Sequence, residues 1–201
     1  MAINASQRIL ELARTQRLLS AADVRKRGES AQLLLKLHQA GKLQRVARGV
    51  YSLPDHPPTE HQTLAEVCQR LPKAVICLLS ALQFHEIGTQ LPHEVWIALP
   101  EGTQTPVVTY PPLRIVRLRG AAYADGIEMV MNQGTPIRVY CVAKTVTDCF
   151  KFRNKIGLDV ALEALKDTWR QRRVTMDELT RCARIDRVER VMRPYLEAMV
   201  A

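Results

Sequence analysis

One stretch decides the fold of the N-terminal quarter of the chain: LLSAADVRKRGESAQLLLKLHQAGKLQRVARGVYSLP, residues 18–54. Its first helix is expected after Ser20, because a serine with an acidic group three positions later, here Asp23, is typical of a helix N-terminus. Gly28 ends this helix, since glycine tolerates the left-handed conformation common at helix C-termini. Upstream, residues 6–15 carry an apolar stripe that predicts another amphipathic helix.

A third helix is expected from residue 29 or 30 to about residue 40. Leu34, Leu35 and Leu37 are assigned to its buried face. Two short strand-like pieces then flank a turn at Ala47-Arg48-Gly49, which predicts a β-hairpin. Three helices followed by a basic hairpin is the layout of a winged helix-turn-helix, in which the third helix enters the major groove of DNA and the hairpin is the wing.

The distribution of charge favours DNA as the partner of this segment. The chain has a formal net charge of +9. Residues 1–55 hold 10 Lys/Arg and 4 Asp/Glu, a net +6; residues 56–140 hold 6 and 7, a net −1; residues 141–201 hold 13 and 9, a net +4. A positive field concentrated in one small domain attracts nucleic acid. The alternative is a three-helix module that binds only protein.

The candidate DNA contacts are of two chemical kinds, hydrogen-bonding side chains and cations. Ser30 and Gln32, on the third helix, have the directed donors and acceptors that base readout requires. Arg45 and Arg48, near the hairpin tip, would reach phosphates or the minor groove. The full set of DNA-binding candidates is Lys26, Arg27, Ser30, Gln32, Lys36, Lys42, Arg45 and Arg48.

The segment PDHPPTEH, residues 54–61, has three prolines within five residues and is interpreted as a linker between domains. The expected domains are therefore a winged helix-turn-helix at 1–55 and a second domain at 60–201. In the second domain the pattern predicts helices and four strands, at residues 94–99, 113–118, 127–131 and 137–140. The predicted class is α+β: an N-terminal winged helix-turn-helix, then an α+β domain with a mainly antiparallel sheet and C-terminal helices.

Catalytic motifs are missing from the sequence. There is no HExxH, no Walker A loop, no GxGxxG and no GxSxG. His85 and His93 lie near acidic residues, but no metal motif joins them, and we expect neither metal nor cofactor. Ser80 lacks the flanking glycines of an exposed nucleophile and is interpreted as a helix N-cap. Lys144 and Asp148, four residues apart, are interpreted as an ion pair on a helix.

The compartment is expected to be the cytoplasm. The five cysteines are odd in number and widely spaced, which indicates free thiols in a reducing environment. The opening MAINASQRIL lacks the layout of a signal peptide, and the longest apolar stretch, at residues 74–82, is too short to span a bilayer. No membrane association is expected.

Three runs together resemble AbiEi-type antitoxins, winged-helix regulators of abortive-infection toxin–antitoxin systems. They are the opening stretch quoted above, then KAVICLLSALQFHEIGTQLPHEVWIALP, and then TPIRVYCVAKTVTDCFKFRNKIGLDVALEALK, and the likeness spans roughly residues 7–170. The resemblance implies an antitoxin that binds double-stranded DNA at its own promoter and represses it. Its partner would be a toxin similar to nucleotidyltransferases, counteracted without a stable complex in what is called a type IV system. It also implies a role in the antitoxin domain for Ser80, Lys144 and Asp148.

Two other functions remain open at this point. A nucleic-acid-processing enzyme would need clustered carboxylates or a metal triad, and the seven acids of the middle segment are scattered. A protein-interaction module would use the same basic surfaces for a protein partner.

Overall fold

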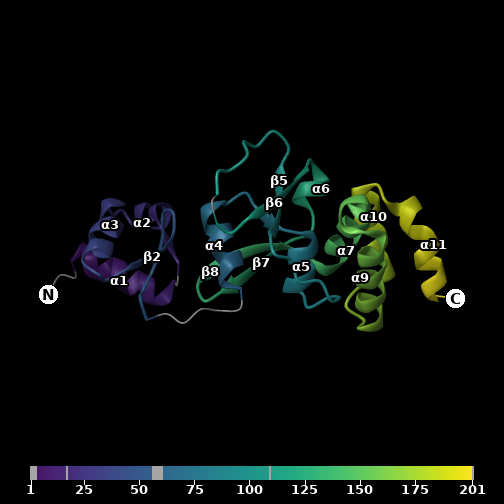
Figure 1. The fold of residues 1–201 in the computed structure, drawn as a ribbon, viewed down its shortest axis with the longest axis horizontal. Helices are drawn as coiled ribbons and strands as arrows, with labels where there is room; N and C mark the ends of the chain where they lie inside the picture. Colours follow the sequence, from purple (N-terminus) through teal and green to yellow (C-terminus); the bar gives the residue numbers. More distant parts are fainter. Residues whose placement is uncertain (1–3, 17, 56–60, 109, 201) are drawn as a thin grey trace. The chain divides into compact units, whose positions relative to one another are not determined.

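The computed structural model describes residues 4–16, 18–55, 61–108 and 110–200. The chain divides into two compact units (Figure 1). The N-terminal unit comprises residues 1–72 and 129–137, and the C-terminal unit comprises residues 73–128 and 138–201. Helices and two separate sheets are present among the described residues, and the α+β class is confirmed.

The N-terminal unit has the expected layout of a winged helix. Its elements are α1 (Ala5–Thr15), β1 (Leu19–Ser20), α2 (Ala21–Lys26), α3 (Gln32–Gln39), β2 (Gln44–Ala47), β3 (Val50–Ser52) and α4 (Gln62–Arg70). The strands form a small antiparallel sheet in the order β1-β3-β2. Its core contains Ile9, Ala13, Leu19, Val24, Leu34, Leu37, Leu43 and Tyr51. Burial of these apolar groups holds the three helices against the hairpin.

The expected helix ends of this unit are confirmed. The Asp23 carboxylate accepts a hydrogen bond from the Ser20 backbone N–H at 2.8 Å, and the Ser20 hydroxyl accepts one from the Asp23 N–H at 3.4 Å. This reciprocal capping box starts α2. Gly28 has φ 75° and Gly41 has φ 69°, the left-handed conformation that glycine supplies after α2 and α3.

Two details of the third helix differ from the expectation. Leu35 is 49% exposed, so its assignment to the buried face was wrong. On a helix that turns about 100° per residue, Leu35 lies about 160° from Leu37, and the core covers only the side that carries Leu34 and Leu37. In addition α3 begins at Gln32, which places Ser30 in the turn before it.

The proline-rich segment lies mostly outside the described residues, because residues 56–60 are not described. The boundary between the compact units falls at residues 72 and 73, one helix beyond that segment. Helix α4 is part of the N-terminal unit, where it packs against β1 and β3 of the small sheet.

The second sheet has five strands: β4 (Val75–Ile76), β5 (Val95–Pro100), β6 (Leu113–Leu118), β7 (Ile127–Asn132) and β8 (Thr135–Tyr140). Their order is β6-β5-β4-β8-β7. Strand β4 runs antiparallel to β5 but parallel to β8, and β5 is parallel to β6. This sheet is therefore mixed, whereas every described pairing of the small sheet is antiparallel. The long connection between β5 and β6 lets the chain return to the same end of the sheet, which a parallel pair requires.

The helices of the C-terminal unit are α5 (Leu78–Phe84), α6 (Ala121–Ala124), α7 (Val142–Lys151), α8 (Arg153–Ile156), α9 (Leu158–Arg170), α10 (Met176–Asp186) and α11 (Glu189–Val200). Helix α7 is central to the core, because it packs against α5, α9 and α10 (Figure 1). Its residues from Ala143 to Phe150 are all buried. In the described part of the chain, no helix combines the length and apolar character needed to cross a bilayer.

Candidate nucleic-acid interface

The outward face of α3 is formed by Gln32, Leu35, Lys36 and Gln39. All four side chains are exposed, and their spacing of three and four residues places them on one side of the helix. Leu34 and Leu37 are buried on the opposite side. We call the four exposed residues the α3 face. A helix of this kind fits the major groove of B-DNA.

Exposed cations surround the same helix-turn-helix. Arg25, Lys26 and Arg27 lie at the end of α2, and Lys42 follows α3. Among the described residues, no acidic side chain pairs with these four cations or with Lys36, Arg45 or Arg48. Cations without an acidic partner keep their charge available to phosphates.

Two of the four acidic groups of residues 1–55, Asp23 and Glu29, are used inside the unit. The Glu29 carboxylate accepts a hydrogen bond from Arg8 Nε at 2.8 Å, and the Asp23 carboxylate is held by Ser20 and by the Gln69 amide. These carboxylates neutralise or cap residues outside the candidate set. The positive field expected from the count of charges is therefore not cancelled locally.

The wing is built by β2 and β3. Arg45 pairs with Tyr51 in the strand register, and a register irregularity separates Arg45 from Ala47. The Arg45 Nε donates a hydrogen bond to the Ala47 carbonyl at 3.4 Å. Arg48 is exposed in the turn, followed by Gly49 at φ 78°, a conformation that favours glycine. The two wing arginines are thus exposed on one short hairpin.

All eight sequence candidates for DNA contact are exposed: Lys26, Arg27, Ser30, Gln32, Lys36, Lys42, Arg45 and Arg48. Ser30 also has a local function, because its hydroxyl accepts a hydrogen bond from the Gln32 N–H at 3.3 Å at the start of α3. Sequence reasoning missed Leu35. The signal was available in the helical spacing, since Leu35 falls between Gln32 and Gln39 on the polar side.

The remaining candidates lie in the C-terminal unit, and Ser80 is not a helix N-cap. Cys77 holds that position in α5, and Ser80 lies inside the helix. The Ser80 hydroxyl accepts a hydrogen bond from the Trp96 N–H at 2.9 Å and lies 3.5 Å from the Glu94 carbonyl. The interpretation was wrong because the N-cap position of α5 lies three residues earlier, at Cys77. Ser80 instead joins α5 to β5.

The expected ion pair between Lys144 and Asp148 is confirmed, with Lys144 Nζ at 2.6 Å from Asp148 Oδ1. A third member was missed: Asp186, at the end of α10, lies 3.1 Å from the same Nζ. All three side chains are buried, and the Nζ also lies 4.5 Å from the centre of the Tyr140 ring. We call Lys144, Asp148 and Asp186 the buried triad.

The electrostatics of the buried triad follow from burial. Burial raises the pKa of Asp148 to about 7, although the Lys144 ammonium opposes this increase. Burial alone would lower the pKa of Lys144. The nearby Asp148 and Asp186 carboxylates have the larger effect, so the pKa of Lys144 is raised. The Thr147 hydroxyl donates to Asp186 Oδ2 at 2.7 Å. Because the side chains are inaccessible, the triad is suited to holding α7 and α10 together and not to binding a ligand.

His85 is likewise occupied within the fold. Its side chain is buried, with Nε2 2.7 Å from the Tyr140 carbonyl oxygen, whereas His93 is exposed. Burial lowers the pKa of His85. In the described ranges no three His, Cys, Asp or Glu side chains are grouped in a way that could hold a metal ion.

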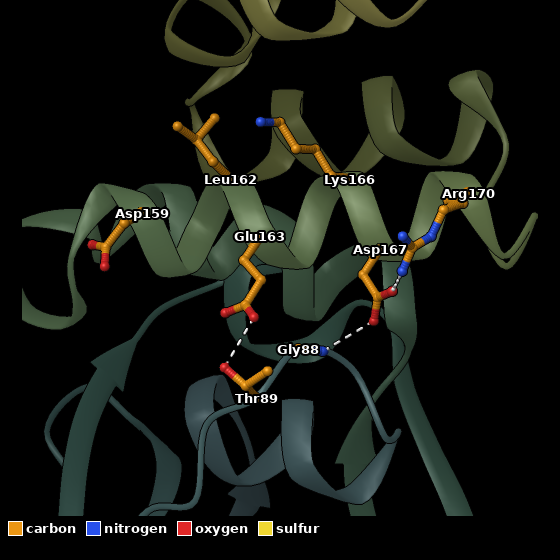
Figure 2. Close-up of a pocket in the computed structure, with 8 residues that line it drawn as sticks. All are labelled: Gly88, Thr89, Asp159, Leu162, Glu163, Lys166, Asp167 and Arg170. Carbon is orange, nitrogen blue, oxygen red and sulfur yellow. Dashed lines mark hydrogen bonds and ion pairs between the residues drawn. The ribbon is translucent and has the colours of Figure 1, made fainter.

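Figure 2 shows a hollow between α9 and the loop that follows α5. Its polar groups contact one another. Glu163 accepts a hydrogen bond from the Thr89 hydroxyl at 3.0 Å, and Asp167 accepts one from the Gly88 N–H at 3.1 Å while pairing with Arg170 at 3.0 Å. The Gly88 N–H also lowers the pKa of Asp167. These contacts attach the loop to α9.

The N-terminal unit combines a winged helix-turn-helix with exposed cations, an arrangement found in many proteins that bind nucleic acid. Residues 7–54 match the family model described as "Transcriptional regulator, AbiEi antitoxin". The resemblance expected from the sequence is confirmed for this segment, which is similar to the winged helix of AbiEi transcriptional regulators. No curated protein gives a significant match to the chain.

The fold resembles that of a solved structure over most of the chain. The crystal structure of the RV2827C protein from Mycobacterium tuberculosis superposes with a TM-score of 0.57 at 15% sequence identity. The match covers 89% of this chain and 71% of the other. At this identity the similarity shows a shared fold.

Proposed function

We propose that the chain is a transcriptional regulator that binds double-stranded DNA at its own promoter and represses transcription, as the antitoxin of a type IV toxin–antitoxin system. The observation that carries the proposal is the α3 face together with its unpaired cations, in a segment that matches the AbiEi regulator model. In this proposal α3 enters the major groove, and Arg45 and Arg48 of the wing contact phosphates or the minor groove.

The candidates take different parts in binding. Lys26, Arg27, Lys36 and Lys42 neutralise phosphates, which adds affinity without sequence information. Gln32 contacts base edges, because an amide can bond an adenine with two hydrogen bonds. Ser30, in the turn before α3, contacts the DNA backbone or a base next to Gln32.

The C-terminal unit supplies the antitoxin activity in this proposal, and no catalytic step is assigned to it. Its functional partner is a toxin similar to nucleotidyltransferases, encoded beside it and counteracted in the cytoplasm. Ser80 and the pair of Lys144 and Asp148 contribute by maintaining the fold of this unit, since their polar atoms are engaged with neighbouring elements.

Gel-shift titration of the full chain tests DNA binding. The probe is the duplex immediately upstream of its own coding sequence, the control is a scrambled duplex of the same composition, and both are titrated over a salt series. We expect tighter binding to the upstream duplex, with an affinity that falls steeply with salt as counterions are released. Equal, weak binding to both duplexes would contradict the promoter proposal. A stable protein complex without DNA binding would favour an interaction module instead.

A further inference from the structure

Leu35 is unusual among the residues of the winged helix. Within described residues 4–55 it is the only large hydrophobic side chain that is exposed, at 49%. Its neighbours on the α3 face are Gln32, Lys36 and Gln39, which are polar or charged. An apolar group at this place is not needed for the core, because Leu34 and Leu37 already supply the buried side of α3.

The surroundings of Leu35 do not suit a protein partner. Protein interfaces have a core of neighbouring apolar side chains that is depleted in charge. On α3 the leucine stands alone among amides and an ammonium, and cations without acidic partners lie at both ends of the helix. This combination of one apolar group with hydrogen-bonding side chains and positive charge matches the major groove of DNA.

The major groove offers one apolar feature, the C5-methyl group of thymine, beside an adenine that an amide side chain can bond. Leu35 is three positions after Gln32, so the two side chains are neighbours along one side of α3. We propose that Leu35 contacts a thymine methyl group and thereby makes binding depend on a thymine at a fixed position of the operator. This inference rests on the proposed promoter binding and adds which base feature the helix reads.

The test uses two forms of the duplex upstream of the coding sequence, one natural and one with every thymine replaced by uracil. The replacement removes the methyl groups and leaves the hydrogen-bonding edges and phosphates in place. We expect the natural chain to bind the uracil duplex about fourfold more weakly for each methyl group that Leu35 covers, from the free energy of burying one such group. Leu35→Ala should lose affinity for the natural duplex and bind both forms equally.

Two further variants act as controls. Lys36→Ala, from the same face, should weaken binding to both duplexes and keep the ratio between them, because a phosphate contact does not sense the methyl group. Leu35→Met keeps an apolar side chain of similar volume and should retain most of the ratio. Leu35 is exposed, so these variants should fold, which circular dichroism and thermal unfolding verify.

Several outcomes would overturn the inference. If uracil weakens binding of Leu35→Ala as much as that of the natural chain, the methyl effect acts through DNA shape or another residue. If the natural chain prefers its upstream duplex but binds both forms equally, the inference fails while the proposed function stands. If the natural chain binds neither form, the proposed function fails as well. A loss of self-association in Leu35→Ala, with an unchanged ratio, would assign the leucine to a protein interface.

Discussion

The two units use charged residues in opposite ways. In the N-terminal unit the cations of the helix-turn-helix and wing are exposed and, among described residues, have no acidic partner. In the C-terminal unit Lys144 is buried between Asp148 and Asp186. Some exposed arginines of that unit are paired, Arg181 with Asp125 and Arg184 with Glu189, whereas no described acidic side chain pairs with Arg190 or Arg193 of α11. A count of charges alone treats these groups alike, whereas burial and pairing distinguish cations that are available to a polyanion from cations that maintain the fold.

The two basic segments of the chain differ in how many acidic residues accompany their cations. Residues 141–201 contain more Lys and Arg than residues 1–55, but they also contain more acids. Ion pairs at the surface contribute little to stability, yet they reduce the local field that a polyanion senses. Unpaired cations beside an exposed helix are therefore better evidence for a DNA surface than the net charge of the chain.

The largest effect is expected from Lys144→Met, which removes the buried cation of the C-terminal unit. The substitution leaves Asp148 and Asp186 buried without their counter-ion, so we expect the free energy of unfolding to fall by about 3–5 kcal/mol. The folded fraction should retain its affinity for DNA. Urea denaturation followed by circular dichroism measures the decrease.

Lys166→Met, an identical change at an exposed position of α9, is the matched control and should change stability by less than about 0.5 kcal/mol. If the two variants are destabilised equally, the buried triad is not what holds α7 and α10 together.

The double variant Arg45→Ala with Arg48→Ala should instead change DNA binding and not stability. Stability should be unchanged, because both side chains are exposed. DNA affinity should decrease on all sequences alike, because phosphates are the same in every duplex. The slope of log affinity against log salt should become shallower by about 2, since each arginine that no longer neutralises a phosphate accounts for roughly one unit. Fluorescence anisotropy over a salt series measures both quantities.

The matched control removes two exposed arginines from α11 of the C-terminal unit, Arg190→Ala with Arg193→Ala. It changes the net charge by the same amount. An equal decrease of affinity in this control would mean that binding responds to total charge and not to the wing.

Local signals predicted much of the N-terminal unit. Helix α2 begins with the capping pair of Ser20 and Asp23, and α2 and α3 are followed by Gly28 and Gly41. These signals depend only on residues within a few positions of one another, so the sequence alone predicts the helix ends. Leu35 could not be placed by counting apolar residues, because burial depends on which side of α3 the core covers. The structure shows all eight DNA candidates exposed, whereas their contacts with DNA stay predictions.

Contacts between residues that are far apart in the chain could not be predicted from the sequence. The pairing of β4 with β8 joins residues that are far apart in the chain, and β4 is only two residues long. The position of Asp186 beside Lys144 depends on the packing of α10 against α7, and no local pattern records it. The pairing of Lys144 with Asp148 was predictable because four residues make one helical turn.

A third prediction concerns the pH dependence of stability. Burial raises the pKa of Asp148 to about 7, above the value of about 3.9 in an unfolded chain. The folded state therefore binds more protons than the unfolded state between these values, and the contribution of Asp148 to stability falls as pH rises through this window. Asp148→Asn should remove this negative component from the pH profile. Urea denaturation at a series of pH values measures it, and a profile with the same slope in both proteins would contradict the assignment.

The last prediction concerns the chemical reactivity of a thiol. Cys141 is the N-cap of α7, and a hydrogen bond from the Cys182 thiol lowers its pKa to about 7, with the Lys144 N–H assisting and burial opposing. Burial instead raises the pKa of Cys149 and Cys77. Since the thiolate is the reactive form, iodoacetamide should label Cys141 first near neutral pH.

Cys182→Ala separates the two causes of this reactivity, as measured by peptide mass spectrometry over a pH series. Removing the thiol donor should move the midpoint of the labelling rate of Cys141 upward, towards the ordinary value of about 8.5. The N–H groups at the start of α7 remain, so the midpoint should stop short of that value. An unchanged midpoint would assign the effect to the helix N-terminus alone, and labelling of Cys149 as fast as Cys141 in the folded chain would contradict the burial that distinguishes them.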